Sequence, residues 1–426
     1  MILSLKIKNF LSFKDEVTFS FEATKDKSLE KYQVVEVAPG VRISKLGVVY
    51  GANASGKSNL VIAFDFLQVF WFNIPKSKDD LIDSTPFLLD NTSRDNLSEF
   101  ELTFYIEGKK YIYSLKTTVE KVYSETLIYY PGIRPAEIFT RTLNDNISEI
   151  RLNPKLKVSA AAKEEIEVKC LTNMSVFAAY NKVNVQLAEM DVVISFIKKQ
   201  LLRSVKPTTA IVDYVKALLF NDNSRKPYIL DFLNKADFNI TDVDIQAYKD
   251  VLSESVVADL KADYNIPDSF IDKIEKERFL QIQTAFFVHK VIDKEGKESL
   301  FMLPEGLQSS GTLRIMGLAG VLSRVINQNA FVAIDEIESS LHPKLIEFFI
   351  ESFLKQSKTA QLLLTTHYDG LLEEEDLLRN DNIWFTNKRK DGSTELYSLS
   401  DFKGVNRITS LQKAYKYGKF GAIPNI

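Results

Sequence analysis

Eight residues near the N-terminus, Gly51-Ala52-Asn53-Ala54-Ser55-Gly56-Lys57-Ser58, match the P-loop pattern, and Asn59 follows them. An apolar strand is expected before this segment, at 46–50, and a helical repeat of apolar residues after it, at 60–71. In such a loop the glycines let backbone N–H groups turn toward phosphate oxygens, the lysine reaches the β and γ phosphates, and the serine hydroxyl ligates Mg²⁺. We therefore expect residues 51–59 to bind a nucleotide, with Lys57 on the phosphates and Ser58 on the metal.

Two adjacent carboxylates, Asp335 and Glu336, end the apolar strand expected at 331–334. At the carboxyl end of a P-loop sheet such a pair can divide the work of hydrolysis: Asp335 would hold Mg²⁺ through water, and Glu336 would activate the attacking water. An acidic exit from a strand is also common without any catalytic role. The P-loop in the same chain favours the catalytic interpretation.

Two of the three histidines follow the last two apolar strands. His342 lies in Glu338-Ser339-Ser340-Leu341-His342-Pro343, and His367 follows the strand expected at 361–365. A histidine at a strand end can read the γ-phosphate and orient a water molecule by hydrogen bonding. Single histidines are more often structural or surface residues, but this position favours a catalytic role for His367.

Ser309, Ser310, Gly311 and Thr312 directly precede an amphipathic helical stretch. Such a helix start can be a simple N-cap, and it can also be an anion site, because hydroxyls and free N–H groups face outward along the helix dipole. A chain with its own P-loop needs no second phosphate site. We therefore expect residues 309–312 to serve the nucleotide of a second copy of the chain.

The composition excludes several classes of protein. With 426 residues, 45% apolar and 26% charged, the chain resembles ordinary globular proteins, and Cys170 alone cannot form a disulfide framework, which fits a reducing cytoplasm. The sequence contains no run of about 18 apolar residues, the length that would predict a membrane span. A net charge of −3 disfavours a nucleic-acid binder with a basic surface throughout.

The elements expected around these sites indicate an α/β fold. Alternating patterns at 2–8 and 17–22 predict an antiparallel pair of strands, and segments rich in aromatic and β-branched residues at 99–106, 110–117 and 125–130 predict an antiparallel meander. Apolar strands separated by helices predict a mostly parallel core sheet. Helices are expected from about 160 to 277. We predict three parts: 1–155 and 281–426 forming an ATPase head, and 156–280 forming a helical insertion lobe.

In their order along the chain, these motifs resemble the ATP-binding-cassette type of ATPase. Residues 51–58 resemble its Walker A motif, 309–312 a degenerate signature motif, 331–336 the Walker B motif, 340–342 the D-loop, and His367 the switch histidine. The long span between Walker A and signature is similar to the SMC, RecF and OLD branch. The resemblance implies ATP and Mg²⁺ as ligands and a head-to-tail dimer that buries two ATP molecules.

Segments near the two ends of the chain indicate a more specific group within this type of ATPase. The resemblance is to stand-alone bacterial AAA-family ATPases, including RloA-type, abortive-infection and PARIS anti-phage ATPases. It is carried by Lys8-Asn9-Phe10-Leu11-Ser12-Phe13-Lys14 and by the tail 415–424.

Three features of the sequence depart from the pattern of these families. The signature lacks one glycine, the Q-loop glutamine has no clear counterpart near 85–90, and too few residues follow His367 for the Toprim nuclease of OLD enzymes.

The resemblance implies a cytoplasmic defence ATPase that controls a separate effector, such as a Toprim-type nuclease. The alternative is a DNA-repair clamp of the RecF or SMC kind, which would need a basic channel. Its candidate residues, 388–390 and Lys413, Lys416 and Lys419, are more often solvated surface. The sheet-rich segment and helical insertion after the Walker A helix disfavour the motor subunit of a transporter. A function as a small-molecule kinase would not explain residues 309–312 or His367.

Overall fold

The computed structural model describes residues 1–155, 158–236, 239–251, 253–254, 276–277 and 279–424. The chain divides into two compact units. The first comprises Met1–Thr208, Arg324–Ser339 and Ile346–Ile426, and the second comprises Thr209–Ser323 and Ser340–Leu345. Within the described residues, no helix is both long enough and apolar enough to cross a membrane.

The core of the first unit is a five-stranded sheet with the order β14-β15-β5-β16-β17. Its strands are β5 (Leu46–Gly51), β14 (Phe331–Ile334), β15 (Gln361–Thr366), β16 (Ile383–Lys388) and β17 (Thr394–Ser398). The first four in this order are parallel, and β17 is antiparallel to β16. Every residue of β5, β14 and β15 is buried, as expected for a parallel sheet covered on both faces. Their carboxyl ends meet at one edge, which places the P-loop, Asp335 and His367 together.

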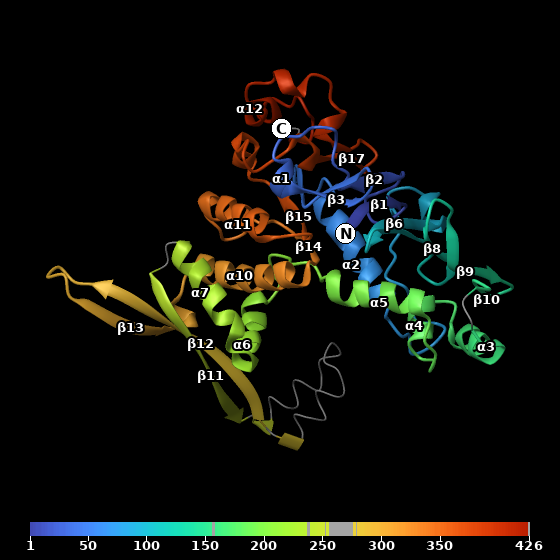
Figure 1. The fold of residues 1–426 in the computed structure, drawn as a ribbon, viewed down its shortest axis with the longest axis horizontal. Coiled ribbons are helices and arrows are strands. Elements are labelled where there is room, and N and C mark those ends of the chain that lie inside the picture. The colour runs from blue at the N-terminus through green and yellow to red at the C-terminus, as the bar shows by residue number, and fades with distance from the viewer. Residues whose placement is uncertain (156–157, 237–238, 252, 255–275, 278, 425–426) are drawn as a thin grey trace. The chain divides into compact units, whose positions relative to one another are not determined.

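Two helices flank this sheet, α2 (Lys57–Phe70) and α11 (Pro343–Gln356) (Figure 1). Phe64 of α2 packs on Phe331 of β14, with ring centroids 4.8 Å apart. The buried face of α11 includes Phe349, Ile350 and Phe353. Apolar residues at helical spacing thus hold the start of α2, and with it the end of the P-loop, against the sheet.

A seven-stranded antiparallel sheet with the order β10-β9-β8-β7-β6-β1-β2 completes the first unit. The strands are β1 (Ile2–Lys8), β2 (Val17–Ser20), β6 (Ser98–Ile106), β7 (Lys109–Thr117), β8 (Val122–Tyr129), β9 (Ala136–Asn144) and β10 (Ile147–Leu152). Helices α3 (Ala160–Lys169), α4 (Val176–Tyr180) and α5 (Ala188–Gln200) belong to the same unit. Phe104 of β6 stacks on Phe196 of α5 at 5.1 Å, and Trp71 contacts both Tyr113 of β7 and Phe177 of α4.

The first unit also contains three short elements near the N-terminus, α1 (Glu30–Gln33), β3 (Val34–Ala38) and β4 (Val41–Ser44), and one helix near the C-terminus, α12 (Leu411–Lys416). Helix α12 and the tail that follows it pack on the core sheet through aromatic rings. Phe385 of β16 stacks on Tyr415 and Phe420, at 5.7 and 5.4 Å. Tyr415 also contacts Tyr50, the residue before the P-loop, at 5.9 Å. The tail therefore supports the strand that carries the P-loop.

The second unit contains a three-stranded antiparallel sheet, β11 (Ile240–Val251), β12 (Phe279–Ile292) and β13 (Glu298–Pro304). It also contains α6 (Ile211–Asn221), α7 (Lys226–Lys235) and most of α10 (Ser310–Gln328). Two glycines of α10 let α6 approach closely. A Cβ at Gly317 would lie 2.4 Å from Ile211, and one at Gly320 would lie 2.3 Å from Val215.

The structure corrects the expectation of helices throughout 160–277. Ile240–Val251 is a strand, because Val243, Ile245 and Ala247 alternate with polar residues and pair with β12. Strands β9, β10, β16 and β17 were also not expected. The predicted division into three parts remains a prediction. The bounds of the two compact units differ from it, because α3 to α5 belong to the first unit, whereas α6, α7 and β11 belong to the second.

Candidate functional site

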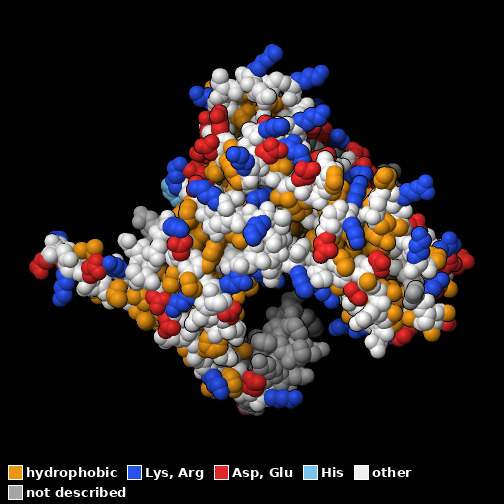
Figure 2. All heavy atoms as spheres, in the orientation of Figure 1, with side chains coloured by type: hydrophobic (Ala, Val, Ile, Leu, Met, Phe, Trp, Pro, Cys, Tyr) orange, Lys and Arg blue, Asp and Glu red, His pale blue; other side chains and the backbone are white. Residues whose placement is uncertain are grey.

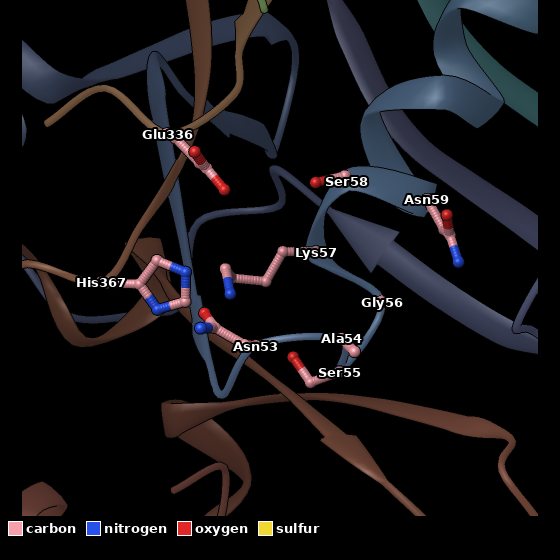
Figure 3. A pocket seen from close by; sticks show the side chains of 9 residues that line it. All are labelled: Asn53, Ala54, Ser55, Gly56, Lys57, Ser58, Asn59, Glu336 and His367. Atoms are coloured by element: carbon pink, nitrogen blue, oxygen red, sulfur yellow. The ribbon is translucent and has the colours of Figure 1, made fainter. Parts of the chain in front are cut away.

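The loop between β5 and α2 surrounds a cavity of about 380 Å³. The lining residues are Asn53, Ala54, Ser55, Gly56, Lys57, Ser58, Asn59, Glu336 and His367. Figure 3 shows the side chains of Lys57, Glu336 and His367 directed toward the same space, from three different segments of the chain. The structure thus brings the P-loop, one of the two adjacent carboxylates and the histidine into one site of the first unit.

The conformation of the loop depends on its two glycines. A Cβ at Gly51 would lie 2.3 Å from Oγ1 of Thr386, and a Cβ at Gly56 would lie 2.3 Å from Oγ1 of Thr394. Gly56 also has a φ of 106°, in the region that favours glycine. The loop backbone can therefore approach β16 and β17 only because these positions carry no side chain.

Hydroxyl groups from distant segments anchor the loop. Oγ of Ser55 lies 2.6 Å from Oγ1 of Thr386, and Oγ1 of Thr394 donates to the carbonyl of Ser55 at 2.8 Å. Oγ of Ser12, in the N-terminal segment, accepts from Nδ2 of Asn59 at 2.7 Å and donates to Oγ1 of Thr394 at 2.7 Å. The segment around Ser12 was singled out from the sequence, but these contacts were not predicted, because those made by Thr386 and Thr394 join residues more than three hundred positions apart.

Lys57 is buried at the start of α2. Its Nζ donates to the carbonyls of Gly51 and Ala52, at 2.9 and 3.1 Å. Burial lowers the pKa of Lys57 to about 8, against the opposing effect of Glu338, Asp335 and other nearby carboxylates. The ammonium group therefore lies in a poorly solvated place beside the cavity, where phosphate oxygens would be strong acceptors.

The two adjacent carboxylates have different surroundings. Asp335 is buried, and its Oδ1 accepts from Oγ1 of Thr365 at 2.5 Å. The same Oγ1 accepts from the backbone N–H of Glu336 at 2.9 Å. Glu336 has a φ of 49°, which is uncommon for a residue with a side chain. Thr365 thus holds Glu336 in this conformation, and the Glu336 side chain reaches the cavity.

His367 is fixed through its backbone by a second acidic residue. Its N–H donates to Oε1 of Glu338 at 2.5 Å, and Oε2 of Glu338 is buried without a hydrogen-bond donor among the described residues. Burial and the nearby Lys57 lower the pKa of His367 below its ordinary value of 6.5. The imidazole is therefore neutral at pH 7. Sequence reasoning missed Thr365 and Glu338 as site residues, although both stand beside predicted ones.

Ser309, Ser310, Gly311 and Thr312 begin α10 in the second unit. Oγ of Ser309 accepts from the N–H of Thr312 at 3.0 Å, so Ser309 caps the helix. Ser309 and Ser310 are exposed, and Thr312 is buried. A Cβ at Gly311 would lie 2.9 Å from the carbonyl of Ser340. Ser309 therefore has the capping role, and Ser310 is an exposed residue at the helix start.

Residues 85–90, considered for the Q-loop, are tied to the N-terminal segment. Leu11 donates its N–H to Thr85 at 2.9 Å, Phe87 donates to Oδ1 of Asn9 at 3.1 Å, and Asp90 pairs with Lys14 at 2.9 Å. The stretch contains no glutamine, and none of its residues lines the cavity.

The donors around the cavity fit a nucleotide with Mg²⁺. Among the described residues, His, Cys, Asp and Glu form no cluster of three or more that could hold a metal ion alone. Mg²⁺ in nucleotide sites usually takes one or two protein oxygens and completes its shell with phosphates and water. The hydroxyl of Ser58 and the carboxylate of Asp335 are oxygen donors of this kind.

Comparison with known proteins finds similar solved structures and one matching protein family. The chain is similar to the SMC head domain from Thermotoga maritima, with 12% identity, a TM-score of 0.42, and coverage of 93% of this chain and 98% of that chain. It is also similar to an Smc head bound to the C-terminal winged-helix domain of ScpA, with 16% identity, a TM-score of 0.40, and coverage of 97% and 99%. A third likeness is an Smc head with an extended coiled coil bound to the C-terminal domain of ScpA, derived from Pyrococcus furiosus, with 14% identity, a TM-score of 0.37, and coverage of 98% of each chain.

The family of AAA domains described as putative AbiEii toxin, type IV toxin–antitoxin system, matches residues 46–155 and 198–373. These ranges contain the P-loop, both carboxylates, the helix start at 309–312 and His367, and they cover more than half of the chain. The protein belongs to this family of AAA domains.

Proposed function

We propose that this protein binds ATP with Mg²⁺ and hydrolyses it. The observation that carries the proposal is the single cavity that the P-loop, Glu336 and His367 line together. Backbone N–H groups of the loop and the dipole of α2 would bind phosphate oxygens, and Lys57 would exchange its two carbonyl acceptors for the phosphates. Ser58 and Asp335 would hold Mg²⁺, which supplies charge neutralisation to the phosphates when bound.

Glu336 is proposed as the general base and His367 as a hydrogen-bonding group at the γ-phosphate. The neutral imidazole can donate one N–H and accept at the other nitrogen, which suits a group that orients a water molecule. Thr365 is a positioning residue, because it links the backbone of Glu336 to the carboxylate of Asp335. A proton taken from the water by Glu336 leaves an attacking hydroxide next to the phosphate.

Lys57→Ala tests the binding step. We expect titration calorimetry with ATP and Mg²⁺ to show no measurable binding, because the variant loses the cation that offsets the phosphate charge. Lys198→Ala, at an exposed position on α5 away from the cavity, is the matched control and should bind as the wild type does. Unchanged affinity in Lys57→Ala would refute the P-loop assignment.

The site is proposed to be shared between two copies of the chain. In a head-to-tail dimer, the helix start at 309–312 of each copy would face the γ-phosphate bound by the other. The exposed Ser310 supports this, since its hydroxyl lies at the positive end of a long helix. ATP would then join the two copies, and hydrolysis would release them.

The proposed biological role is that of a bacterial defence ATPase that controls a separate effector, such as a Toprim-type nuclease. The family's description as a putative AbiEii toxin supports a role of this class. A phage challenge of cells that carry the gene with its neighbours tests it: protection should require Lys57. Protection that persists with Lys57→Ala would contradict an ATP-dependent role.

The alternative role as a DNA clamp has less support. Arg389, in the basic stretch 388–390, pairs with Asp15 at 2.6 Å and Glu395 at 2.8 Å, and Lys416 pairs with Asp369 at 3.4 Å. These carboxylates reduce the positive charge offered to a phosphate backbone. A DNA affinity that falls steeply with salt would favour the clamp instead.

A further inference from the structure

The sheet of the second unit ends in an exposed apolar edge strand. Among the described residues, β13 pairs only with β12, so its outer edge is open. Four consecutive residues of β13 are exposed, with exposed fractions of 66% for Leu300, 53% for Phe301, 52% for Met302 and 36% for Leu303. Figure 2 shows hydrophobic side chains along the hairpin of β12 and β13. An open edge of this composition readily pairs with another strand.

The hairpin fixes which backbone groups of β13 face outward. At its turn, Asp293 donates its N–H to the carbonyl of Lys297 at 3.0 Å. Hydrogen-bonded and non-hydrogen-bonded pairs alternate along an antiparallel ladder. Phe301 therefore directs its N–H and C=O toward β12, and Leu300 and Met302 direct theirs away from the sheet.

We propose that β13 pairs with β13 of a second copy of this chain, antiparallel, around a twofold axis beside Phe301. Leu300 exchanges backbone hydrogen bonds with Met302 of the partner subunit, and Phe301 faces Phe301 of the partner subunit. The two sheets become one continuous sheet through an isologous contact. This interface needs no nucleotide and is separate from the head-to-tail dimer proposed above.

Charge complementarity favours this register. It places Glu298 opposite Pro304 of the partner subunit and Lys297 beside Glu305 of the partner subunit, so opposite charges meet and like charges do not. A shift of two residues either way would move Lys297 away from Glu305 of the partner subunit and lose this pairing of opposite charges.

Cysteine cross-linking tests this register. In nucleotide-free buffer, Phe301→Cys should form a disulfide-linked dimer under mild oxidation, because directly opposed residues of this kind lie about 4.5 Å apart at Cα, within disulfide range. Ser299→Cys is the matched control, since its two copies would lie roughly 13 Å apart along the strands. The wild type is the blank, because Cys170 is buried and burial raises its pKa to about 11. Cross-linking of Phe301→Cys no faster than Ser299→Cys would overturn the proposal.

Sedimentation gives an independent measurement of the same interface. The nucleotide-free wild type should be a dimer, and both Phe301→Lys and Met302→Lys should raise the dissociation constant on the order of tenfold or more. Ile133→Lys, at a residue that is 97% exposed in the first unit, should leave the dimer intact. A monomeric wild type, as expected if β13 pairs only with another protein, would overturn the proposal, and so would an unchanged dimer in both lysine variants.

Discussion

Glu336 combines a left-handed backbone with a side chain that lines the cavity beside Lys57. Strained backbone positions of this kind are enriched at functional sites. We expect Glu336→Gln to slow ATP hydrolysis roughly a hundredfold or more, because the amide cannot take the proton from water. Single-turnover hydrolysis measures this, with Glu347→Gln on α11 as the control. Full turnover in Glu336→Gln would show that another group is the base.

His367 gives a prediction about pH. Because burial and Lys57 lower its pKa below 6.5, the free enzyme carries a neutral imidazole at pH 7 and gains the proton only on further acidification. We expect kcat/KM, which reports the free enzyme, to rise as pH falls through 8, because Lys57 with its pKa of about 8 gains its proton, and the decline caused by His367 to begin only below pH 6.5. His367→Asn should lower the rate and remove this acidic decline. A histidine-dependent decline above pH 6.5 would contradict a lowered pKa.

At the scale of elements, a buried ion pair joins β8 and β9 to the start of α4. Arg141 and Glu125 are fully buried and 3.5 Å apart, and Glu125 also accepts from Oγ of Ser175 at 2.6 Å and the N–H of Val176 at 2.9 Å. Burial raises the pKa of Glu125 despite the neighbouring arginine. Removing the arginine would leave this carboxyl without its counter-charge.

We therefore expect Arg141→Met to lower the free energy of unfolding of the first unit by about 3–5 kcal/mol. Thermal and urea unfolding measure the change, and Arg134→Met, at an exposed position, should have an effect within about 0.5 kcal/mol. The double variant Glu125→Leu with Arg141→Met should recover part of the loss, because no unpaired buried charge remains. Equal midpoints for Arg141→Met and Arg134→Met would exclude a structural role for the pair.

Elements with strong local signals could be predicted from the sequence. The bounds of β14 coincide with the apolar run 331–334, and β5, α2, α11 and β15 lie where periodicity and the P-loop place them. Strand β11 was missed because the alternation at Val243 and Ile245 lies directly after helical segments with similar apolar content. The supporting residues could not be predicted. Thr365, Glu338 and Thr394 reach the site only through pairing of strands that are distant in the sequence.

At the scale of the whole molecule, the proposed mechanism requires two copies of the chain to share each nucleotide site. The P-loop cavity belongs to the first unit and Ser310 to the second. A substitution in the P-loop can therefore disable one half of a shared site, and a substitution at Ser310 can disable the other half. Ser310 suits this purpose, because it is exposed and the helix cap is made by Ser309. Gly311 does not, because any side chain there would meet the carbonyl of Ser340.

Mixing two inactive variants tests the shared site most directly. Lys57→Ala and Ser310→Glu should each lack ATPase activity, and Ser310→Glu should still bind ATP. In a mixed dimer, one site combines the intact P-loop of one variant with the intact helix start of the other, so the mixture should regain a clear part of the wild-type rate. A mixture that stays as inactive as its two folded components would contradict a site completed by a second copy.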